Sequence, residues 1–391
     1  MTPPSTIAQN SRTTLHRIGT VLCVLTFGLI VWGGHVNTTL SGMAFPDWPT
    51  SNQAPMVTYS PSEWLWAKDR FWEHGHRLFA TLVGMVTTLM LVVAYRATPR
   101  EQRPGKALAG LIAVVFATIA SAIIGLNAMP GGFMEAFMIM LAVLTIMFVV
   151  RALGKSGQER IVWLCMAAFT AVCLQGSFGG YTVRNNLPDW TSTTHGALAQ
   201  LFLMIALGIT LLTSKRWNSA KAEVPMTRGT ANVVVLTWAL TFLQFVLGAL
   251  TRHTLSWGVS NSFPHWSDSG FFPSAEMWQY AQVIIHFVHR TLAYVVAGMI
   301  VAQFIKLRRE GAPSEINRTA LASLALVGVQ ILLGAGILWT ARGELVTTLH
   351  VMVGVTILIL NAATMMSVLR QPLSRSSEDD VRGLAHQGGG R

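Results

Sequence analysis

The sequence is poor in charge, in acidic residues and in cysteine. Only 12% of its 391 residues are charged, whereas 52% are hydrophobic and the mean hydropathy is +0.48. The charged share is about half of the roughly 25% that is usual for a soluble domain, which excludes an ordinary cytosolic enzyme. The three cysteines, Cys23, Cys165 and Cys173, all lie in apolar segments. This placement excludes a disulfide framework or a zinc site and predicts small packing residues.

Long apolar runs are abundant. Ten of them are long enough to cross about 30 Å of hydrocarbon at about 1.5 Å per helical residue. They lie near 18–36, 76–95, 107–127, 134–150, 161–181, 194–213, 231–251, 284–305, 319–339 and 345–368. We expect an all-α polytopic membrane protein with about ten transmembrane helices surrounded by membrane lipid. No small-residue cleavage site follows a short apolar run near the start, so the first helix is expected to stay as an anchor.

The basic residues are distributed unevenly. A net charge of +11 would suit a nucleic-acid binder, but the predicted topology gives another explanation. If both termini are cytoplasmic, 21 of the 28 basic residues fall in inner segments. The seven on the outer side are Lys68, Arg70, Arg77, Arg184, Arg252, Arg290 and Arg342. This bias follows the positive-inside rule. We therefore expect a protein of the bacterial cytoplasmic (inner) membrane, with both termini cytoplasmic and no nucleic-acid partner.

The sequence contains an internal repeat. Residues 73–80 match 286–293 at an offset of 213, and 175–180 match 330–335 at an offset of 155. Gly33 and the following 39–41 match Gly248 and 254–256. Three matches in the same order predict a duplicated four-helix unit. Because four is an even number, both copies enter the membrane in the same direction, with one equivalent site in each copy and a pseudo-twofold axis along the membrane normal.

The repeat also predicts the domain organisation. The two offsets differ by 58 residues, the length of a helical hairpin, and we assign this insertion to about 97–154 in the first copy. The expected parts are a cytoplasmic tail 1–17, the first repeat 18–213, a cytoplasmic linker 214–230, the second repeat 231–369 and a cytoplasmic tail 370–391.

Four of the eleven histidines obey the repeat. His76 corresponds to His289, and His195 to His350. Each copy then has two neutral imidazoles near the outer ends of facing helices, which is the axial ligand set of a six-coordinate haem iron in a helix bundle. We predict one bis-His haem per half. The alternative is that the imidazoles only form hydrogen bonds between helices.

Charged residues beside these histidines suggest further roles. Arg77 and Arg290 directly follow a predicted ligand, and we expect each guanidinium to pair with a haem propionate; an interfacial, snorkelling arginine is the alternative. The repeat breaks where Glu73 corresponds to His286. Glu73 lies three residues before His76, so it reaches the same helix face and is our candidate catalytic carboxylate. Its alternative is a solvated interfacial glutamate. We expect chemistry in the first half and electron relay in the second.

These residues together resemble the haem A synthase family over nearly the whole chain except the insertion and the tails. The motifs that carry the resemblance are Gly33-Gly34, Ser41-Gly42, Pro46-Asp47-Trp48-Pro49, Glu73-x-x-His76-Arg77, Gln175-Gly176-x-x-Gly179-Gly180, His195-Gly196, His289-Arg290 and His350. Taken singly, each is weak. Their order on matching helices makes the resemblance specific.

The resemblance implies an oxidoreductase that converts the C8 methyl of haem O to the formyl group of haem A through successive hydroxylations and loss of water. It implies that His76 and His195 contact the substrate haem, that Glu73 is the catalytic carboxylate, and that His289 and His350 ligate a permanent haem b. Haem O is then the substrate and haem A the product. The implied partners are haem O synthase and cytochrome oxidase assembly factors.

Two departures and two competing functions accompany the resemblance. Many relatives carry a cysteine pair in the first outer loop, but the loop 37–72 has none, and Phe45 stands where they often have cysteine. Ten predicted helices in place of eight are the second departure. A di-haem b membrane cytochrome that carries electrons between quinol and an acceptor would need the histidines but not Glu73. A secondary transporter would also show a parallel repeat. The tryptophans of the outer loops suggest an interfacial belt or a lid.

Overall fold

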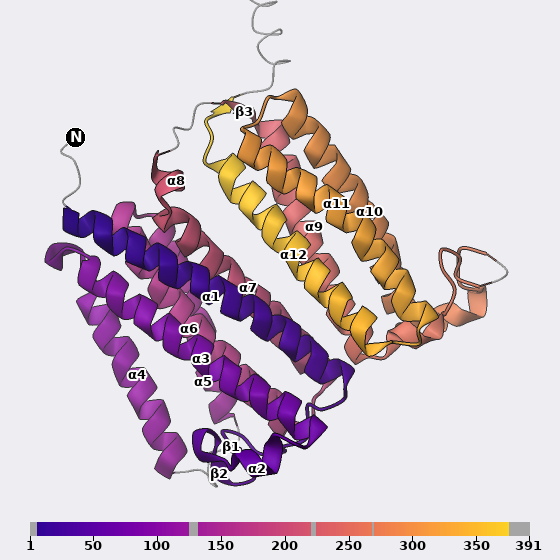
Figure 1. Ribbon diagram of the computed structural model, residues 1–391, viewed down its shortest axis with the longest axis horizontal. Coiled ribbons are helices and arrows are strands. Elements are labelled where there is room, and N and C mark those ends of the chain that lie inside the picture. The colour runs from indigo at the N-terminus through magenta and orange to yellow at the C-terminus, as the bar shows by residue number, and fades with distance from the viewer. Residues whose placement is uncertain (1–5, 125–131, 220–223, 268–269, 375–391) are drawn as a thin grey trace, which may run out of the picture. The chain divides into compact units, whose positions relative to one another are not determined.

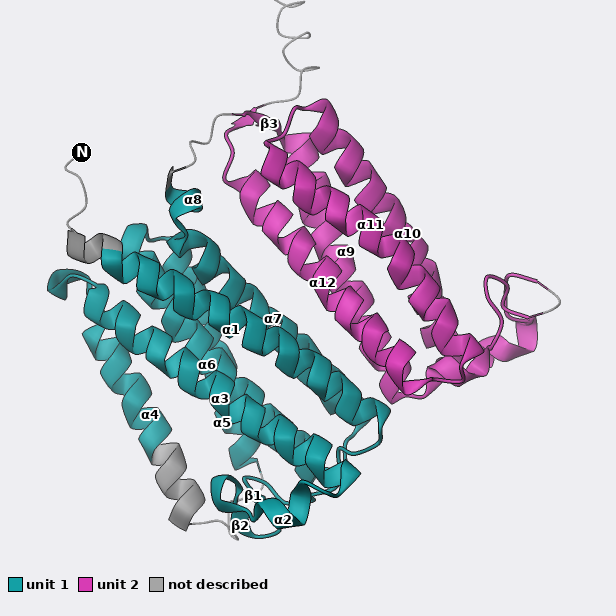
Figure 2. Ribbon diagram, in the orientation of Figure 1, with its two compact units in different colours: residues 1–219 teal, residues 220–391 magenta. Residues whose placement is uncertain are grey.

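The computed structural model describes residues 6–124, 132–219, 224–267 and 270–374, and helices dominate these residues (Figure 1). The chain forms two compact units, Met1–Ser219 and Ala220–Arg391 (Figure 2). Nine helices in the described part are long and apolar enough to cross a membrane. The prediction of an all-α polytopic membrane protein is confirmed.

The first unit is built around a ring of four helices. Its helices are α1 (Thr6–Thr38), α2 (Pro61–Trp64), α3 (Lys68–Ala97), α4 (Gly105–Ile124), α5 (Phe133–Leu153), α6 (Gly157–Arg184), α7 (Asp189–Thr213) and α8 (Lys215–Ser219). Helices α1 and α6 each pack against both α3 and α7, so α3 and α7 are diagonal to one another. Outside this ring, α5 packs on α6. Leu111 of α4 and Phe148 of α5 join the same apolar core.

The second unit is a ring of four helices alone. It consists of α9 (Arg228–His253), α10 (Ala281–Arg309), α11 (Ser314–Trp339) and α12 (Glu344–Leu369). Helices α9 and α11 each pack against both α10 and α12, which makes α10 and α12 the diagonal pair. The first unit therefore contains the helix pair α4 and α5 in addition to the ring that both units share.

The remaining elements are short. In the first unit, β1 (Thr50–Ser51) pairs antiparallel with β2 (Ala54–Pro55). In the second, β3 (Met226–Thr227) pairs parallel with β4 (Leu373–Ser374). Single 3-10 turns cover Met56–Thr58, Arg100–Gln102, Ser256–Val259 and Ala275–Gln279. The predicted linker 214–230 thus contains α8 and β3, and α1 starts inside the predicted tail 1–17.

The backbone repeats at the ends of equivalent helices. Leu40 follows α1 with φ 57° and Leu255 follows α9 with φ 55°. After α6, Asn186 and Leu187 are both left-handed, and Ala341 and Arg342 are left-handed after α11. These residues correspond at the offsets found in the sequence, so the two units share loop geometry as well as helix order.

The predicted membrane segments agree with the helices except at one place. Nine of the ten predicted segments lie in the nine long apolar helices. The tenth, 107–127, lies in α4, whose described apolar stretch, Gly105–Phe116, is shorter; residues 125–127 lie outside the described residues. Apolar side chains such as Leu89, Ile146 and Leu332 are exposed, as expected of surfaces that face lipid.

Candidate functional site

Each predicted histidine ligand faces a glycine on the preceding helix of its ring. A Cβ atom added at the glycine would lie close to Cε1 of the imidazole. The four separations are 2.8 Å for Gly33 and His76, 2.9 Å for Gly179 and His195, 3.0 Å for Gly248 and His289, and 3.3 Å for Gly334 and His350. Hydrogen is therefore the side chain that fits at the first two positions without a shift of the ring. Each glycine therefore leaves space for the edge of an imidazole ring to lie against the backbone of the neighbouring helix.

The structure brings the histidines together in two pairs. His76 is on α3 and His195 on α7, the diagonal helices of the first ring, and the two imidazoles are close enough to interact electrostatically. His289 on α10 and His350 on α12 have the same relation in the second ring. Each pair therefore faces the interior of its own bundle, near the helix ends that carry the long loops.

Three glutamines contact the histidines, and sequence reasoning gave them no role. Gln175 Nε2 donates to the His195 carbonyl oxygen at 3.0 Å and lies 3.2 Å from its Nδ1. Gln244 Nε2 donates to the His289 carbonyl oxygen at 3.0 Å and lies 3.1 Å from its Nδ1. Gln330 Nε2 lies 3.2 Å from His350 Nε2. All three precede the facing glycine by four residues, and this spacing was the available signal.

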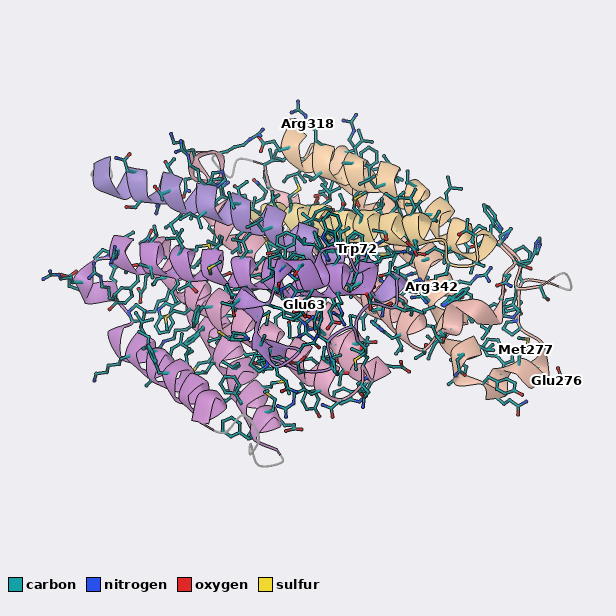
Figure 3. All side chains as sticks on the ribbon, turned by 60° about the horizontal axis from the view of Figure 1, so that its bottom comes forward. Glu63, Trp72, Glu276, Met277, Arg318 and Arg342 are labelled. Atoms are coloured by element: carbon teal, nitrogen blue, oxygen red, sulfur yellow. The ribbon has the colours of Figure 1, made fainter. Side chains whose placement is uncertain are left out.

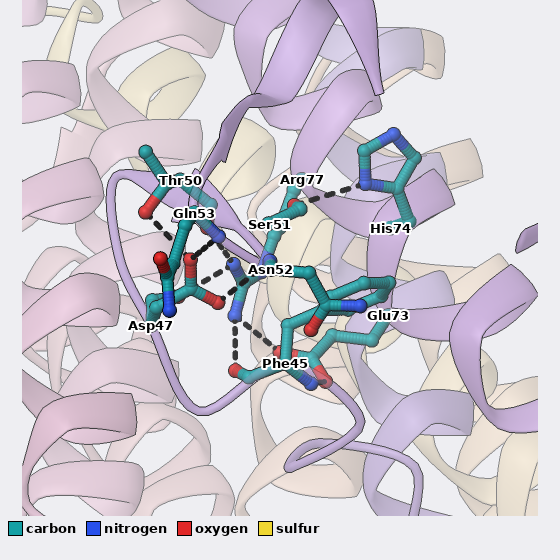
Figure 4. A network of polar contacts seen from close by, with 9 residues as sticks. All are labelled: Phe45, Asp47, Thr50, Ser51, Asn52, Gln53, Glu73, His74 and Arg77. Carbon is teal, nitrogen blue, oxygen red and sulfur yellow. Dashed lines mark hydrogen bonds and ion pairs between the residues drawn. The ribbon is translucent and has the colours of Figure 1, made fainter. Parts of the chain in front are cut away.

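Arg77 and Glu73 hold the first outer loop against α3 (Figure 4). Arg77 Nη1 donates to the carbonyl oxygens of Asp47 at 2.8 Å and Thr50 at 2.9 Å, and Nη2 donates to that of Phe45 at 2.7 Å. Nη2 also pairs with Glu73 Oε1, and the Phe45 N–H donates to Glu73 Oε2 at 2.9 Å. Glu73 is 3% exposed and Arg77 8%. The carboxylate is buried and paired, which excludes a solvated interfacial glutamate.

Arg290 holds residues 260–265, in the loop between α9 and α10, in the same manner. Its Nη2 donates to the carbonyl oxygens of Ser262 at 3.0 Å and His265 at 3.0 Å, and these residues correspond to Asp47 and Thr50. Each loop also contains one cis peptide bond, Trp48–Pro49 and Phe263–Pro264. Both arginines therefore act as clamps on an equivalent stretch of loop. Their predicted pairing with a propionate stays a prediction.

The two units differ in the residue four positions before the arginine that holds each loop. His286 replaces Glu73, and its ring centroid lies 5.3 Å from that of Trp266. In the first loop, the Trp48 ring packs directly onto the backbone at Gly180, where an added Cβ would overlap it. Gly180 adjoins Gly179, which faces His195. The clamped loop thus reaches the wall of the first histidine pair.

Arg252 lies near the second histidine pair, and Arg342 lies near Arg252. Arg252 near the end of α9 interacts electrostatically with His350 and with Arg342, which follows α11. Figure 3 shows Arg342 at the opposite end of the second unit from Arg318, which is in the first turns of α11. The corresponding residues of the first unit are Asn37 and Leu187, which are uncharged. Burial lowers the pKa of Arg342 below its ordinary value.

The residues present fit a haem better than a bare metal ion. Within the described residues no group of three or more His, Cys, Asp or Glu side chains could hold an ion. A macrocycle brings four nitrogen ligands of its own and needs two imidazoles from the protein. Buried polar atoms near the pairs also lack hydrogen-bond partners among the described residues. These are Nδ1 of His76 and His350 and Oε1 of Gln175, Gln244 and Gln330.

The fold and these sites define a polytopic all-α membrane protein with two related four-helix units and one imidazole pair in each. Over residues 16–135 and 131–364 the chain matches the cytochrome oxidase assembly protein family. It belongs to this family.

Several curated relatives are similar to this chain in sequence. A haem A synthase of a Caulobacter strain is 24% identical over 370 residues, 90% of this chain and 95% of the relative. A haem A synthase of Rhizorhabdus wittichii is 23% identical over 379 residues, 86% of this chain and 89% of the relative. One of a Bradyrhizobium strain is 28% identical over 229 residues, 54% and 57% of the two chains. The predicted kinship with the haem A synthases is confirmed.

Proposed function

We propose that the protein is a haem A synthase that oxidises the C8 methyl group of haem O to the formyl group of haem A within the membrane. The observation that carries this proposal is the asymmetry of two otherwise equivalent sites. Both rings contain a glycine-backed imidazole pair, but only the first has a buried carboxylate, Glu73, one turn from a histidine. The names of the relatives point to the same reaction.

The four histidines are the proposed ligands. His76 and His195 would hold the substrate haem in the first unit, and His289 and His350 would hold a haem b in the second. A haem held by these residues would supply one-electron chemistry. The protein supplies the imidazoles at matching depths and places each against a glycine, so that the rings enter the bundle without displacing a helix.

Glu73 is the proposed catalytic carboxylate. Its Oε1 pairs with Arg77 and its Oε2 accepts from the Phe45 N–H, so both oxygens have fixed positions. A carboxylate held in this way can stabilise positive charge that develops nearby, or exchange a proton, without first reorienting. Because His286 takes this place in the second unit, the proposal assigns chemistry to the first unit and electron relay to the second.

The first outer loop is the proposed cover of the substrate site. Residues 45–50 are tied to Arg77 by three backbone acceptors, and Trp48 lies on Gly180, next to the glycine that faces His195. Such a cover would keep water out of the first ring. Arg77 donates four of its five N–H groups within this clamp, so Nε is the atom left for the proposed propionate.

The cellular setting follows from the same proposal. We place the protein in the bacterial inner membrane with both termini cytoplasmic, because the basic residues concentrate on that side. Haem O synthase and cytochrome oxidase assembly factors are its proposed partners, as source of the substrate and destination of the product.

The test is to express the chain together with a source of haem O and to analyse the extracted haems by chromatography. Accumulation of haem A supports the synthase. A chain that shows low-spin bis-His spectra but yields only haem B would instead be a di-haem b cytochrome that carries electrons between quinol and an acceptor, the second candidate, which the equivalence of the two histidine pairs favours.

A further inference from the structure

The four histidines are held by one recurring arrangement that is incomplete at a single position. In three cases a glutamine, a glycine four residues later and a histidine on the next helix of the ring come together. A spacing of four residues places the glutamine and the glycine on the same helix face, one turn apart. The glycine lets the imidazole approach, and the glutamine reaches the ring or its backbone carbonyl oxygen.

The exception is the arrangement around His76. A Cβ atom added at Gly33 would lie 2.8 Å from Cε1 of His76, the shortest of the four separations. Four residues before Gly33 stands Leu29, where the equivalent residue before Gly248 is Gln244. Leu29 packs with the apolar core of the first unit and has no group that can form a hydrogen bond. Nδ1 of His76 is buried without a hydrogen-bond partner among the described residues, as is Nδ1 of His350. The imidazole of His350 nevertheless has Gln330 Nε2 at 3.2 Å from its Nε2, whereas the residue at the equivalent place beside His76 is Leu29.

The carboxamide suits a ring nitrogen in either state. Nε2 can donate to an unprotonated ring nitrogen, and Oε1 can accept from a ring N–H after the other nitrogen has bound iron. Oε1 of Gln175, Gln244 and Gln330 has no partner within the described part of the chain, so it is available for this task. Hydrogen bonds of this kind fix the orientation of a coordinating imidazole and raise its basicity.

We propose that Gln175, Gln244 and Gln330 are positioning residues for His195, His289 and His350, and that Leu29 leaves His76 as the releasable ligand. The inference rests on the proposed haem ligation. The second unit then holds its haem between two tethered imidazoles and retains it. The first unit holds its haem between one tethered and one untethered imidazole, which suits a substrate that must enter and a product that must leave.

The chain provides matched variants for the test, because each unit contains the residue that the other lacks. Gln244→Leu gives the second unit the residue of the first, and Leu29→Gln does the reverse. Gln303→Met is the control, since Gln303 is also a buried glutamine of the second unit but its Nε2 donates to Asn361. Full-length chains with His76 and His195 replaced by alanine report on the second unit alone, and chains with His289 and His350 replaced report on the first.

The measurement is the rate at which the haem-loaded chain in detergent transfers haem to excess apomyoglobin. Gln244→Leu should speed release from the second unit about ten- to a hundredfold, the usual effect of removing a hydrogen bond to a coordinating histidine. Leu29→Gln should slow release from the first unit by a similar factor. Gln303→Met should stay within about twofold. The EPR g values of the low-spin ferric haem, which depend on imidazole orientation, should shift in Gln244→Leu and not in Gln303→Met.

The outcomes separate this inference from the proposed function. If Gln244→Leu binds low-spin haem with unchanged release and unchanged g values, or if Leu29→Gln fails to slow release, the positioning role is wrong while the synthase proposal stands. If both units bind no haem at all, both proposals are wrong. Leu29→Gln is expected to slow haem release, whereas poor folding of a variant would speed it. Poor folding therefore cannot explain slower release in Leu29→Gln together with faster release in Gln244→Leu.

Discussion

The two units share their helix order, glycines, histidines and clamped loops, but they differ in one buried hydrogen-bond network. In the second ring, Gln303, Ser323 and Asn361 are all buried. Gln303 Nε2 and Ser323 Oγ both donate to Asn361 Oδ1, and Asn361 Nδ2 donates to Thr241 Oγ1 at 3.3 Å. The corresponding residues of the first ring are Met90, Ala168 and Ala206, equally buried and unable to form side-chain hydrogen bonds through oxygen or nitrogen.

The same contrast appears around the histidine pairs. The second unit has Gln244, Arg252 and Arg342 where the first has Leu29, Asn37 and Leu187. Hydrogen-bond networks between membrane helices fix a single arrangement, so the second ring is built to hold one geometry. The first ring keeps a tethered carboxylate and lacks the network around Asn361. This difference is what a permanent group in one unit and an exchanging one in the other would require.

The proposed division of roles between the two units is tested most directly by replacing one residue in each unit. Glu73→Ala should abolish haem A formation but keep the bis-His spectrum of the second unit, because Glu73 acts only in the first ring. A positioned acid or base typically contributes about 10²- to 10⁴-fold to the rate. His350→Ala should remove the haem b spectrum. Optical spectra and haem extraction from the same membranes measure both.

His286→Ala is the matched control for Glu73→Ala, since it occupies the equivalent position in the second unit. It should retain haem A formation. A fully active Glu73→Ala enzyme would contradict the assignment of chemistry to the first unit.

The loop clamps provide the next largest effect. Lysine cannot reproduce the forked donation of Arg77 to three carbonyl oxygens, and hydrogen bonds to charged groups contribute about 1.5 to 3 kcal/mol each. Arg77→Lys should therefore raise hydrogen exchange in residues 45–50 about a hundredfold and reduce turnover. Mass spectrometry of loop peptides measures the exchange. Arg70→Lys is the control, because Arg70 is half-buried and donates to the Glu63 carbonyl oxygen outside the clamp. It should leave the exchange unchanged; equal exchange in both variants would argue against the cover.

The buried network of the second ring can be tested by giving it the interior of the first. Asn361→Ala alone leaves Gln303 and Ser323 without their acceptor and should destabilise the unit by about 1 to 3 kcal/mol. The triple change Gln303→Met, Ser323→Ala and Asn361→Ala removes all partners together and should cost less than the single one. Thermal unfolding in detergent measures both. A triple variant less stable than Asn361→Ala would show that the network stabilises the unit by more than satisfying its own polar groups.

Much of this arrangement was predictable from the sequence, for identifiable reasons. The length and hydropathy of the runs predicted ten membrane helices, and nine of them are long apolar helices in the described residues. The offsets of 213 and 155 paired the four histidines that the folded rings place together. The contacts of Arg77 were not predictable, because its acceptors are backbone carbonyl oxygens about thirty residues away in an irregular loop. Gln175, Gln244 and Gln330 each precede a facing glycine by four residues, but the sequence assigned them no role, because their partners lie on another helix and appear only after packing.

The smallest expected effect concerns Glu310, which accepts hydrogen bonds from Thr227 and Thr230 at the start of α9. The first unit has Ala97 at the equivalent position and lacks this connection. Burial alone would raise the pKa of Glu310, but hydrogen bonds from Thr230 and from the Thr227 N–H and hydroxyl outweigh it, so the pKa lies below its ordinary value of 4.5. A lowered folded pKa means that the contribution is complete above about pH 4.5 and is lost as the pH falls through the folded value.

Acidification should therefore weaken the junction between α9 and α10 by about 1 kcal/mol, a modest value because the group is partly exposed. Thermal unfolding of the second unit followed by haem absorbance from about pH 7 down to about pH 3 measures this loss, because the loss occurs below pH 4.5. Glu310→Gln should be less stable than the parent at pH 7 and should show a shallower loss below pH 4.5. Equal pH profiles of the two proteins would mean that the ionised carboxylate contributes nothing to stability. The junction between α9 and α10 would then be held by the apolar cluster that contains Leu307 and Ile316.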